Sequence, residues 1–110
     1  MVSIAEFRKM ALSFPNTEEH PHFDRAAFKV TGKRIFATLH EPSNSANFKL
    51  TPGEQSVFAG AENGAMYPVA NKWGLQGWTT IELKKASKEL VMAALEAAYN
   101  EVINSSKKKK

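Results

Sequence analysis

Cysteine is absent from the 110-residue sequence. Its absence excludes disulfide bonds, thiolate nucleophiles, iron–sulfur clusters and zinc sites with cysteine ligands, and is typical of cytoplasmic proteins. No stretch approaches the roughly 18 uncharged apolar residues that a membrane-spanning helix requires. The first residues also lack the basic start and apolar run of a secretory signal. We therefore expect a cytoplasmic protein without a membrane partner.

Sequence signatures of catalysis are also missing. There is no G-x-S-x-G nucleophile elbow, and no glycine has the lysine and spacing of a phosphate-binding P-loop. The one aspartate, Asp24, is adjacent to Arg25, which favours an ion pair over membership of a catalytic triad. The glutamates fall mainly on predicted helix surfaces and loops rather than in a converging pair. We expect a protein that is not an enzyme.

The arrangement most similar to a metal site is His20-Pro21-His22, which has acidic neighbours. Residues two apart on an extended chain point the same way, so His20 and His22 could share an ion. A catalytic zinc site needs three protein ligands, and the remaining histidine is His40. A polar loop with incidental histidines is the favoured interpretation, and we expect no metal and no cofactor.

The charge is balanced apart from one terminal segment. Lys and Arg number 15 against 11 Asp and Glu, and four of the lysines form the run 107–110. Without that run the chain is neutral, so a surface that binds phosphates would require basic side chains to cluster. The length and the hydrophobic content of 43% suit one globular domain. We expect that domain over residues 1–104 and a disordered basic tail over 105–110.

Helix caps predict three helices. Residues 3–14 begin with the capping box S-x-x-E and end before Pro15. Residues 51–59 begin with an N-cap threonine, Thr51, followed by proline at the first helical position. Residues 87–104 form a final helix capped by serine. The first and last helices each carry one apolar stripe, which is typical of helices that cover a core.

Between these helices the hydrophobic period changes to two, which indicates strands. They are predicted at residues 25–30, 34–41, 46–50, 66–69 and 78–83. Residues 16–21 are predicted to be a polar connection and residues 71–77 a loop. Because strands and helices do not alternate, the order α-β(3)-α-β(2)-α predicts an α+β fold. We expect a two-layer sandwich, with an antiparallel sheet covered by helices.

Basic and aromatic residues are interleaved on neighbouring predicted strands. Stacking combined with phosphate contact is how sheets bind single-stranded nucleic acid, and a basic hairpin tip can contact duplex phosphates. The alternative is an ordinary half-buried sheet, with phenylalanines inside and lysines in solvent. The candidate nucleic-acid contacts are Arg25, Lys29, Lys33, Arg34, Lys49, Lys72 and Trp73.

An ordered set of motifs extends over nearly the whole chain apart from the lysine run. The set comprises Phe14-Pro15, Glu18–Phe23, Phe28–Val30, Gly32–Leu39, Phe48–Gln55, Trp73–Thr79 and the long last helix. In this order the motifs resemble the MmcQ/YjbR family, small bacterial proteins described as DNA-binding.

The resemblance implies a fold similar to that of secretion chaperones, α-β(3)-α-β(2)-α. It also implies a double-wing mode of DNA contact, in which β-hairpins act as wings. One wing would be the hairpin that turns at Gly32-Lys33 with Arg34 beside it, and Lys49 and Lys72 would be further phosphate contacts. It implies no catalytic residues.

Three functions follow from the sequence. The first is non-enzymatic binding of DNA through the basic hairpin wings. The second is a protein-interaction adaptor, suggested by the chaperone-like architecture and the aromatic residues of 73–78. The third is binding of a small molecule or metal through His20, His22 and Trp73. The expected partner is DNA or a protein, and a monomer is favoured.

Overall fold

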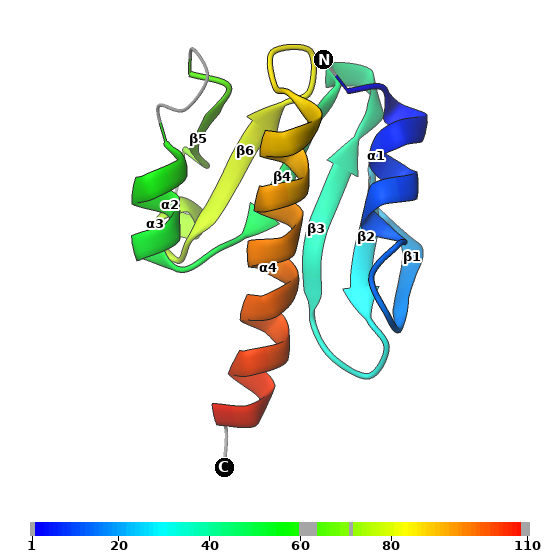
Figure 1. Ribbon diagram of the computed structural model, residues 1–110, viewed down its shortest axis with the longest axis vertical. Helices are drawn as coiled ribbons and strands as arrows, with labels where there is room; N and C mark the ends of the chain where they lie inside the picture. The colour runs from blue at the N-terminus through cyan, green and yellow to red at the C-terminus, as the bar shows by residue number, and fades with distance from the viewer. Residues whose placement is uncertain (1, 60–63, 71, 109–110) are drawn as a thin grey trace.

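A computed structural model describes residues 2–59, 64–70 and 72–108, with the backbone alone for His22 and residues 105–108. Its elements are α1 (Ile4–Ala11), β1 (Thr17–His22), β2 (Arg25–Val30), β3 (Ile35–His40), the 3-10 turn η1 (Glu41–Ser43), β4 (Ser45–Lys49), α2 (Pro52–Phe58), β5 (Met66–Pro68), α3 (Lys72–Leu75), β6 (Trp78–Glu82) and α4 (Lys88–Lys108). All six strands form one antiparallel sheet in the order β1-β2-β3-β4-β6-β5 (Figure 1). This arrangement confirms the predicted α+β fold.

Helices α1 and α4 cover the same face of the sheet, in front of it in Figure 1. The Phe7 ring of α1 contacts the ring of Phe28 at 5.7 Å and that of Phe48 at 6.1 Å. Tyr99 of α4 stacks on Phe14 at 4.8 Å and contacts Phe36 at 5.7 Å. These aromatic contacts place the core between the two helices and the central strands.

The predicted helix starts are confirmed. Both capping boxes form, at Ser3 and at Thr51, and the Ser87 hydroxyl accepts from the Leu90 N–H at 3.1 Å. The predicted ends are less accurate. Helix α1 stops at Ala11 rather than residue 14, because the Pro15 ring would clash with the carbonyl of Ala11, four residues earlier.

The last helix is longer than predicted. Its backbone continues to Lys108, four residues beyond the expected end at Asn104. Lys109 and Lys110, the rest of the predicted basic tail, lie outside the described residues.

Two elements fall where irregular chain was predicted. Residues 17–22 form the edge strand β1, which pairs along its whole length with β2. The sequence did not predict this strand, because its residues are mostly polar and include Pro21. Proline is tolerated there because one side of an edge strand makes no ladder hydrogen bonds. The expected loop at 71–77 contains the short helix α3, although Asn71 itself lies outside the described residues.

Candidate nucleic-acid interface

The face of the sheet that points away from α1 and α4 carries a row of polar side chains. Strand register pairs Thr38 with Asn47 and Asn47 with Thr80, and the Thr80 hydroxyl donates to Asn47 Oδ1 at 2.7 Å. Side chains alternate between the faces of a sheet, so this row lies opposite the core phenylalanines. We call the central part of this surface the open face; it comprises Arg25, Ala27, Lys29, Ile35, Thr38, Asn47, Lys49, Trp78 and Thr80. Strand register places two carboxylates at its margins, Glu18 opposite Lys29 on β1 and Glu82 at the end of β6.

The open face contains a cavity of about 240 Å³. Its apolar walls come from two indoles and two aliphatic side chains, and its polar groups come from β2, β3 and β4. We call it the tryptophan pocket. It is lined by Arg25, Ile35, Thr38, Asn47, Val69, Trp73 and Trp78. Trp73 is 54% exposed, so one part of its indole remains accessible to a ligand.

Gly74 and Gly77 allow the segment 73–78, which carries both tryptophans, to pack closely against its neighbours. At Gly74 a Cβ atom would lie 2.0 Å from the carbonyl oxygen of Val69. Gly77 has a φ of +107°, and a Cβ there would lie 1.8 Å from the carbonyl oxygen of Leu50. Only glycine fits either position, because both backbones pass in contact with a neighbouring strand end.

A glutamine of α2 holds the same segment in place. The Gln55 side-chain amide donates to the carbonyl oxygen of Gly74 at 2.8 Å and to that of Trp78 at 3.1 Å. The Lys49 ammonium donates to the carbonyl oxygen of Gln76 at 2.9 Å. The position of Trp73 is therefore set by contacts with α2, β4 and the end of β5.

The structure brings together four of the seven predicted contacts. Arg25 lines the tryptophan pocket together with Trp73. Lys29 is paired with Ile35, and Lys49 with Trp78, so each lysine lies next to a residue that lines the pocket. The remaining three lie outside it. Lys72 is exposed on α3, and Lys33 and Arg34 are exposed at the β2–β3 turn, at the opposite end of β2 from Arg25.

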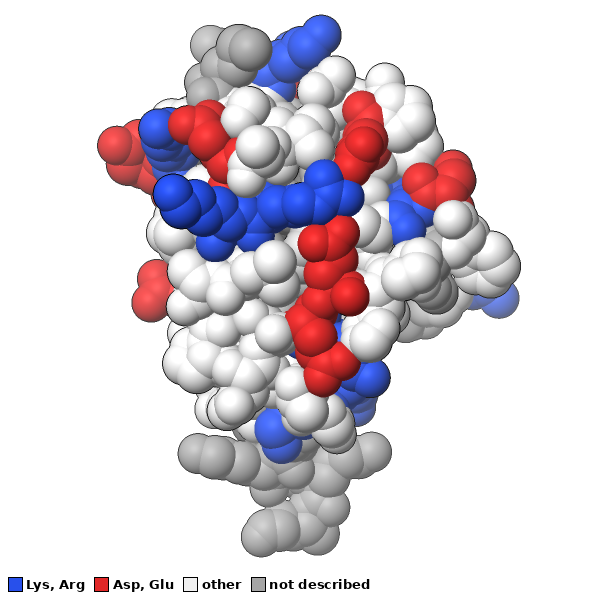
Figure 2. All heavy atoms as spheres, turned by 90° about the vertical axis from the view of Figure 1, so that its right-hand side faces the viewer, with Lys and Arg blue, Asp and Glu red and all other residues white. Residues whose placement is uncertain are grey.

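The predicted cations form no direct ion pair with a described carboxylate, although Glu18 lies opposite Lys29 in the strand register. Within residues 2–59, 64–70 and 72–108, no Asp or Glu oxygen lies within 4 Å of the charged nitrogens of Arg25, Lys29, Lys33, Arg34, Lys49 or Lys72. Arg25 instead donates to the Thr38 hydroxyl at 3.5 Å. The side of the molecule that carries α1 and β1 differs: Figure 2 shows a column of acidic side chains crossed there by basic ones.

The predicted ion pair between Asp24 and Arg25 does not form. The Asp24 carboxylate is 74% exposed and lies 3.2 Å from Nε2 of His40. The other ring nitrogen of His40 lies 2.6 Å from the Ser43 hydroxyl. Adjacent residues on a strand end point to opposite sides, so sequence proximity was misleading here. These hydrogen bonds tie the β1–β2 turn to η1 and leave Arg25 facing the pocket.

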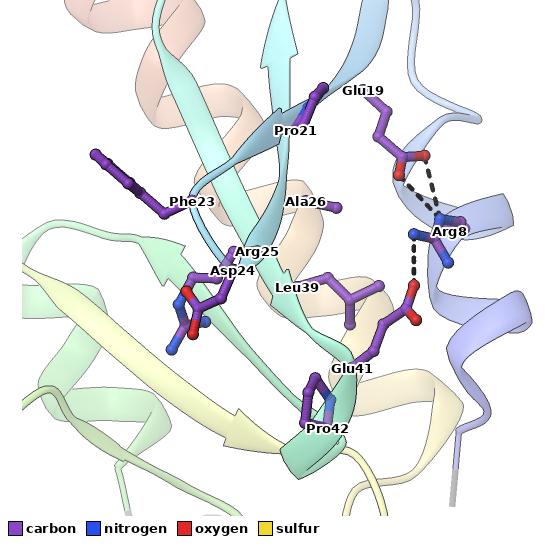
Figure 3. Close-up of a pocket in the computed structure, with 10 residues that line it drawn as sticks. All are labelled: Arg8, Glu19, Pro21, Phe23, Asp24, Arg25, Ala26, Leu39, Glu41 and Pro42. Carbon is purple, nitrogen blue, oxygen red and sulfur yellow. Dashed lines mark hydrogen bonds and ion pairs between the residues drawn. The ribbon is translucent and has the colours of Figure 1, made fainter.

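A larger cavity, of about 480 Å³, lies between α1 and one end of the sheet. Figure 3 shows Arg8 reaching between two carboxylates at its edge. Arg8 Nε lies 3.0 Å from Glu19, and its terminal nitrogen lies 2.6 Å from Glu41. Hydrogen bonds to Glu19 and then Glu41 raise the pKa of the Arg8 guanidinium. Because both carboxylates already occupy Arg8, this cavity is a poor anion site.

The described residues contain no group of three or more His, Asp or Glu side chains that could hold a metal ion. His20 hydrogen-bonds to Glu18, whereas the His22 side chain lies outside the described residues. Shared binding of an ion by the two histidines, the less favoured interpretation of the sequence, is therefore not tested. None of the described helices is long and apolar enough to cross a membrane.

Sequence reasoning missed most of the pocket. In β4 the partly buried Asn47 alternates with buried residues, and its partner Thr38 follows from strand pairing, so this pattern could have placed both beside Arg25. Ile35 shares their face only because the register of β2 and β3 shifts at Phe28/Lys29, which the sequence does not show. Val69 and Trp78 reach the same pocket only through the pairing of β6 with β4 and the hydrogen bond between their backbones.

Comparisons with known proteins agree with the fold. The chain is similar to the Deinococcus radiodurans protein DR2400, a DUF419 domain, with 21% identity and a TM-score of 0.74 over 90% of this chain and 77% of that one. It is also similar to a Pseudomonas syringae protein, with 16% identity and a TM-score of 0.69. This match covers 92% of this chain and 99% of the Pseudomonas protein. No curated protein matches it. The YjbR family model matches residues 12–101. The chain therefore belongs to the YjbR family.

Proposed function

We propose that the protein binds nucleic acid through the open face of its sheet and catalyses no reaction. The observation that carries this proposal is the grouping of Arg25, Lys29 and Lys49 around the tryptophan pocket, none of them within ion-pair distance of a described carboxylate. Each such cation can replace a counterion of a phosphate, and this release is the main source of affinity for nucleic acid.

The β2–β3 hairpin extends the same surface. Lys33 and Arg34 are exposed at its turn, and Gly32 has the positive φ of +77° that a tight turn favours. Phosphates that pass beyond the open face can contact these two side chains. The hairpin supports the wing-like mode of contact expected from the family resemblance.

The chemistry of the pocket favours binding over catalysis. Its hydroxyl group, on Thr38, accepts a hydrogen bond from Arg25. A guanidinium group donates hydrogen bonds and offers no acceptor, so Arg25 cannot act as the base that would activate this hydroxyl.

Charge removal tests the proposal. Binding of a fluorescent oligonucleotide is measured by anisotropy between 50 and about 300 mM salt, a range over which phosphate contacts weaken strongly. Arg25→Gln/Lys29→Gln and Lys33→Glu/Arg34→Glu should each weaken binding and reduce the salt slope by about 2. The matched control is Lys9→Gln/Lys84→Gln, which removes two exposed lysines outside the open face.

Two outcomes would contradict the proposal. One is equal weakening by the control pair. The other is complete loss of binding when only residues 107–110 are deleted, because binding would then belong to the lysine run. Circular dichroism of every variant checks that the fold is retained.

A protein-interaction adaptor is the second candidate. Val57 of α2 is 80% exposed and Leu75 of α3 is 82% exposed, and Gln55 links the two helices directly. Exposed apolar side chains on adjoining helices can bind a protein partner. Capture of a defined partner that survives nuclease treatment, and that Val57→Ser/Leu75→Ser removes, would favour this function.

A further inference from the structure

We infer that the tryptophan pocket takes one unpaired base, so that the open face prefers single-stranded to duplex nucleic acid. The inference rests on the proposed function, which concerns the phosphate contacts alone. The inference adds that the uncharged base of the nucleotide binds in the tryptophan pocket.

The shape of the pocket suits one ring system. Its volume of about 240 Å³ lies below the ~300 Å³ at which pockets for drug-sized ligands begin. Its walls are the indoles of Trp73 and Trp78 together with Ile35 and Val69. Indoles provide flat faces on which any base can stack. A base within a duplex is stacked on both sides, so only an extruded or unpaired base can enter.

The polar groups of the pocket match the edge of a base. The Thr80 hydroxyl donates to Asn47 Oδ1, which orients the Asn47 amide so that its NH₂ group remains the donor for a ligand. The Arg25 guanidinium supplies further donors from the neighbouring strand. Carbonyl oxygens and ring nitrogens of bases are acceptors that both groups can contact.

The flanking cations match a strand that crosses the sheet. Lys29 lies on β2 and Lys49 on β4, so the spacing of two strand intervals separates them by roughly 10 Å across β3. A single strand that places one base in the pocket carries phosphates on both sides of that base. Lys29 and Lys49 lie on the two strands that flank β3, and the Lys49 ammonium also donates to the carbonyl oxygen of Gln76.

The pocket is also preorganised. Gly74 and Gly77 lie in contact with the backbones of Val69 and Leu50, and the Gln55 amide donates to the carbonyl oxygens of Gly74 and Trp78. A side chain already held in its bound position loses little freedom on binding. This is the arrangement expected of a recognition surface, because Trp73 is held in place although it is half exposed.

The experiment compares four fluorescent or competing ligands of matched sequence and length. They are a mixed-sequence single strand, the same strand with abasic sites, the duplex, and the free nucleoside monophosphates. Abasic strands retain the phosphates and lose the rings. Trp73→Ala removes the stacking surface, and Leu75→Ala is its control because Leu75 is exposed on the same helix.

We expect the single strand to bind at least tenfold more tightly than the duplex and the abasic strand. Trp73→Ala should weaken single-strand binding about tenfold and leave abasic and duplex binding within twofold, while Leu75→Ala changes neither. A loss from stacking alone has this size.

The outcomes separate the inference from the proposed function. If abasic and normal strands bind equally well, the base pocket is wrong although phosphate binding stands. If monophosphates bind as tightly as the strand, the pocket is a site for free nucleotides and single-strand preference is overturned. If no oligonucleotide binds, both the proposed function and the inference fail.

Discussion

The side-chain amide of Gln55 lies 2.8 Å from the carbonyl oxygen of Gly74 and connects α2 to the helix that carries Trp73. The same amide donates to the carbonyl oxygen of Trp78. One partly buried side chain therefore supports both indoles of the tryptophan pocket.

Replacing Gln55 with alanine removes these two hydrogen bonds. At about 1 kcal/mol for each bond, Gln55→Ala should lower the free energy of unfolding by about 2 kcal/mol in urea denaturation. It should also weaken single-strand binding, because Trp73 is less firmly held. The control is Ser56→Ala, an exposed neighbour on α2. An unchanged stability of Gln55→Ala would show that these bonds do not hold α3.

Two glycine substitutions separate close packing from backbone strain. Gly77→Ala should lower the free energy of unfolding by more than about 3 kcal/mol, because positive φ is strained and the new Cβ would lie 1.8 Å from a carbonyl oxygen. Gly32 also has a positive φ, but a Cβ atom added there would have no other atom within 4 Å. Gly32→Ala should therefore lower the free energy of unfolding by only about 1–2 kcal/mol. Equal losses in urea denaturation would contradict the packing argument.

The ion pair between Glu6 of α1 and Lys88 of α4 should be sensitive to acid. A hydrogen bond from Lys88, at 2.8 Å, and then one from the Ser3 backbone N–H lower the pKa of the Glu6 carboxyl from 4.5 to about 2. A carboxyl group whose pKa is lower in the folded state stabilises the fold above its unfolded pKa. This stabilisation is lost as the pH falls from about 4.5 towards 2.

Glu6→Gln tests this pH dependence. Glutamine can still complete the capping box, so the variant removes mainly the charge. Its Tm should be slightly below that of the parent at pH 7 and equal to it near pH 2, with the difference smaller in high salt because the pair is exposed. Glu96→Gln, on the exposed part of α4, is the control. A Tm difference that persists unchanged at pH 2 would rule out the ion pair as its source.

Phe7 is the test of the core. The side chain is fully buried and contacts two further phenylalanine rings, so Phe7→Ala should lower the free energy of unfolding by about 3–5 kcal/mol. Phe23, at the β1–β2 turn, is 95% exposed. Phe23→Ala should therefore change the free energy of unfolding by less than about 0.5 kcal/mol. Comparable losses by chemical denaturation would mean that the two rings are not differently buried.

Prediction from the sequence succeeded where structure depends on neighbouring residues. The caps at Ser3, Thr51 and Ser87 act within one helical turn, and the alternation of β2 is visible in six residues. It failed for β1, whose mainly polar residues form a strand because β2 offers its edge. It also failed for α3, where four residues become helical in contact with α2.

The sequence by itself determined the α+β class, most helix and strand positions, the motifs of the YjbR family and the neutrality of the chain without its lysine run. The tertiary structure alone decided which charges are paired and what surrounds the tryptophans. The Asp24 carboxylate forms a hydrogen bond with His40 rather than an ion pair with its neighbour Arg25, and the pocket joins residues from Arg25 to Trp78. The reason is physical: ion pairs and cavities depend on distances in space, which strand register and helix packing set between residues far apart in the chain.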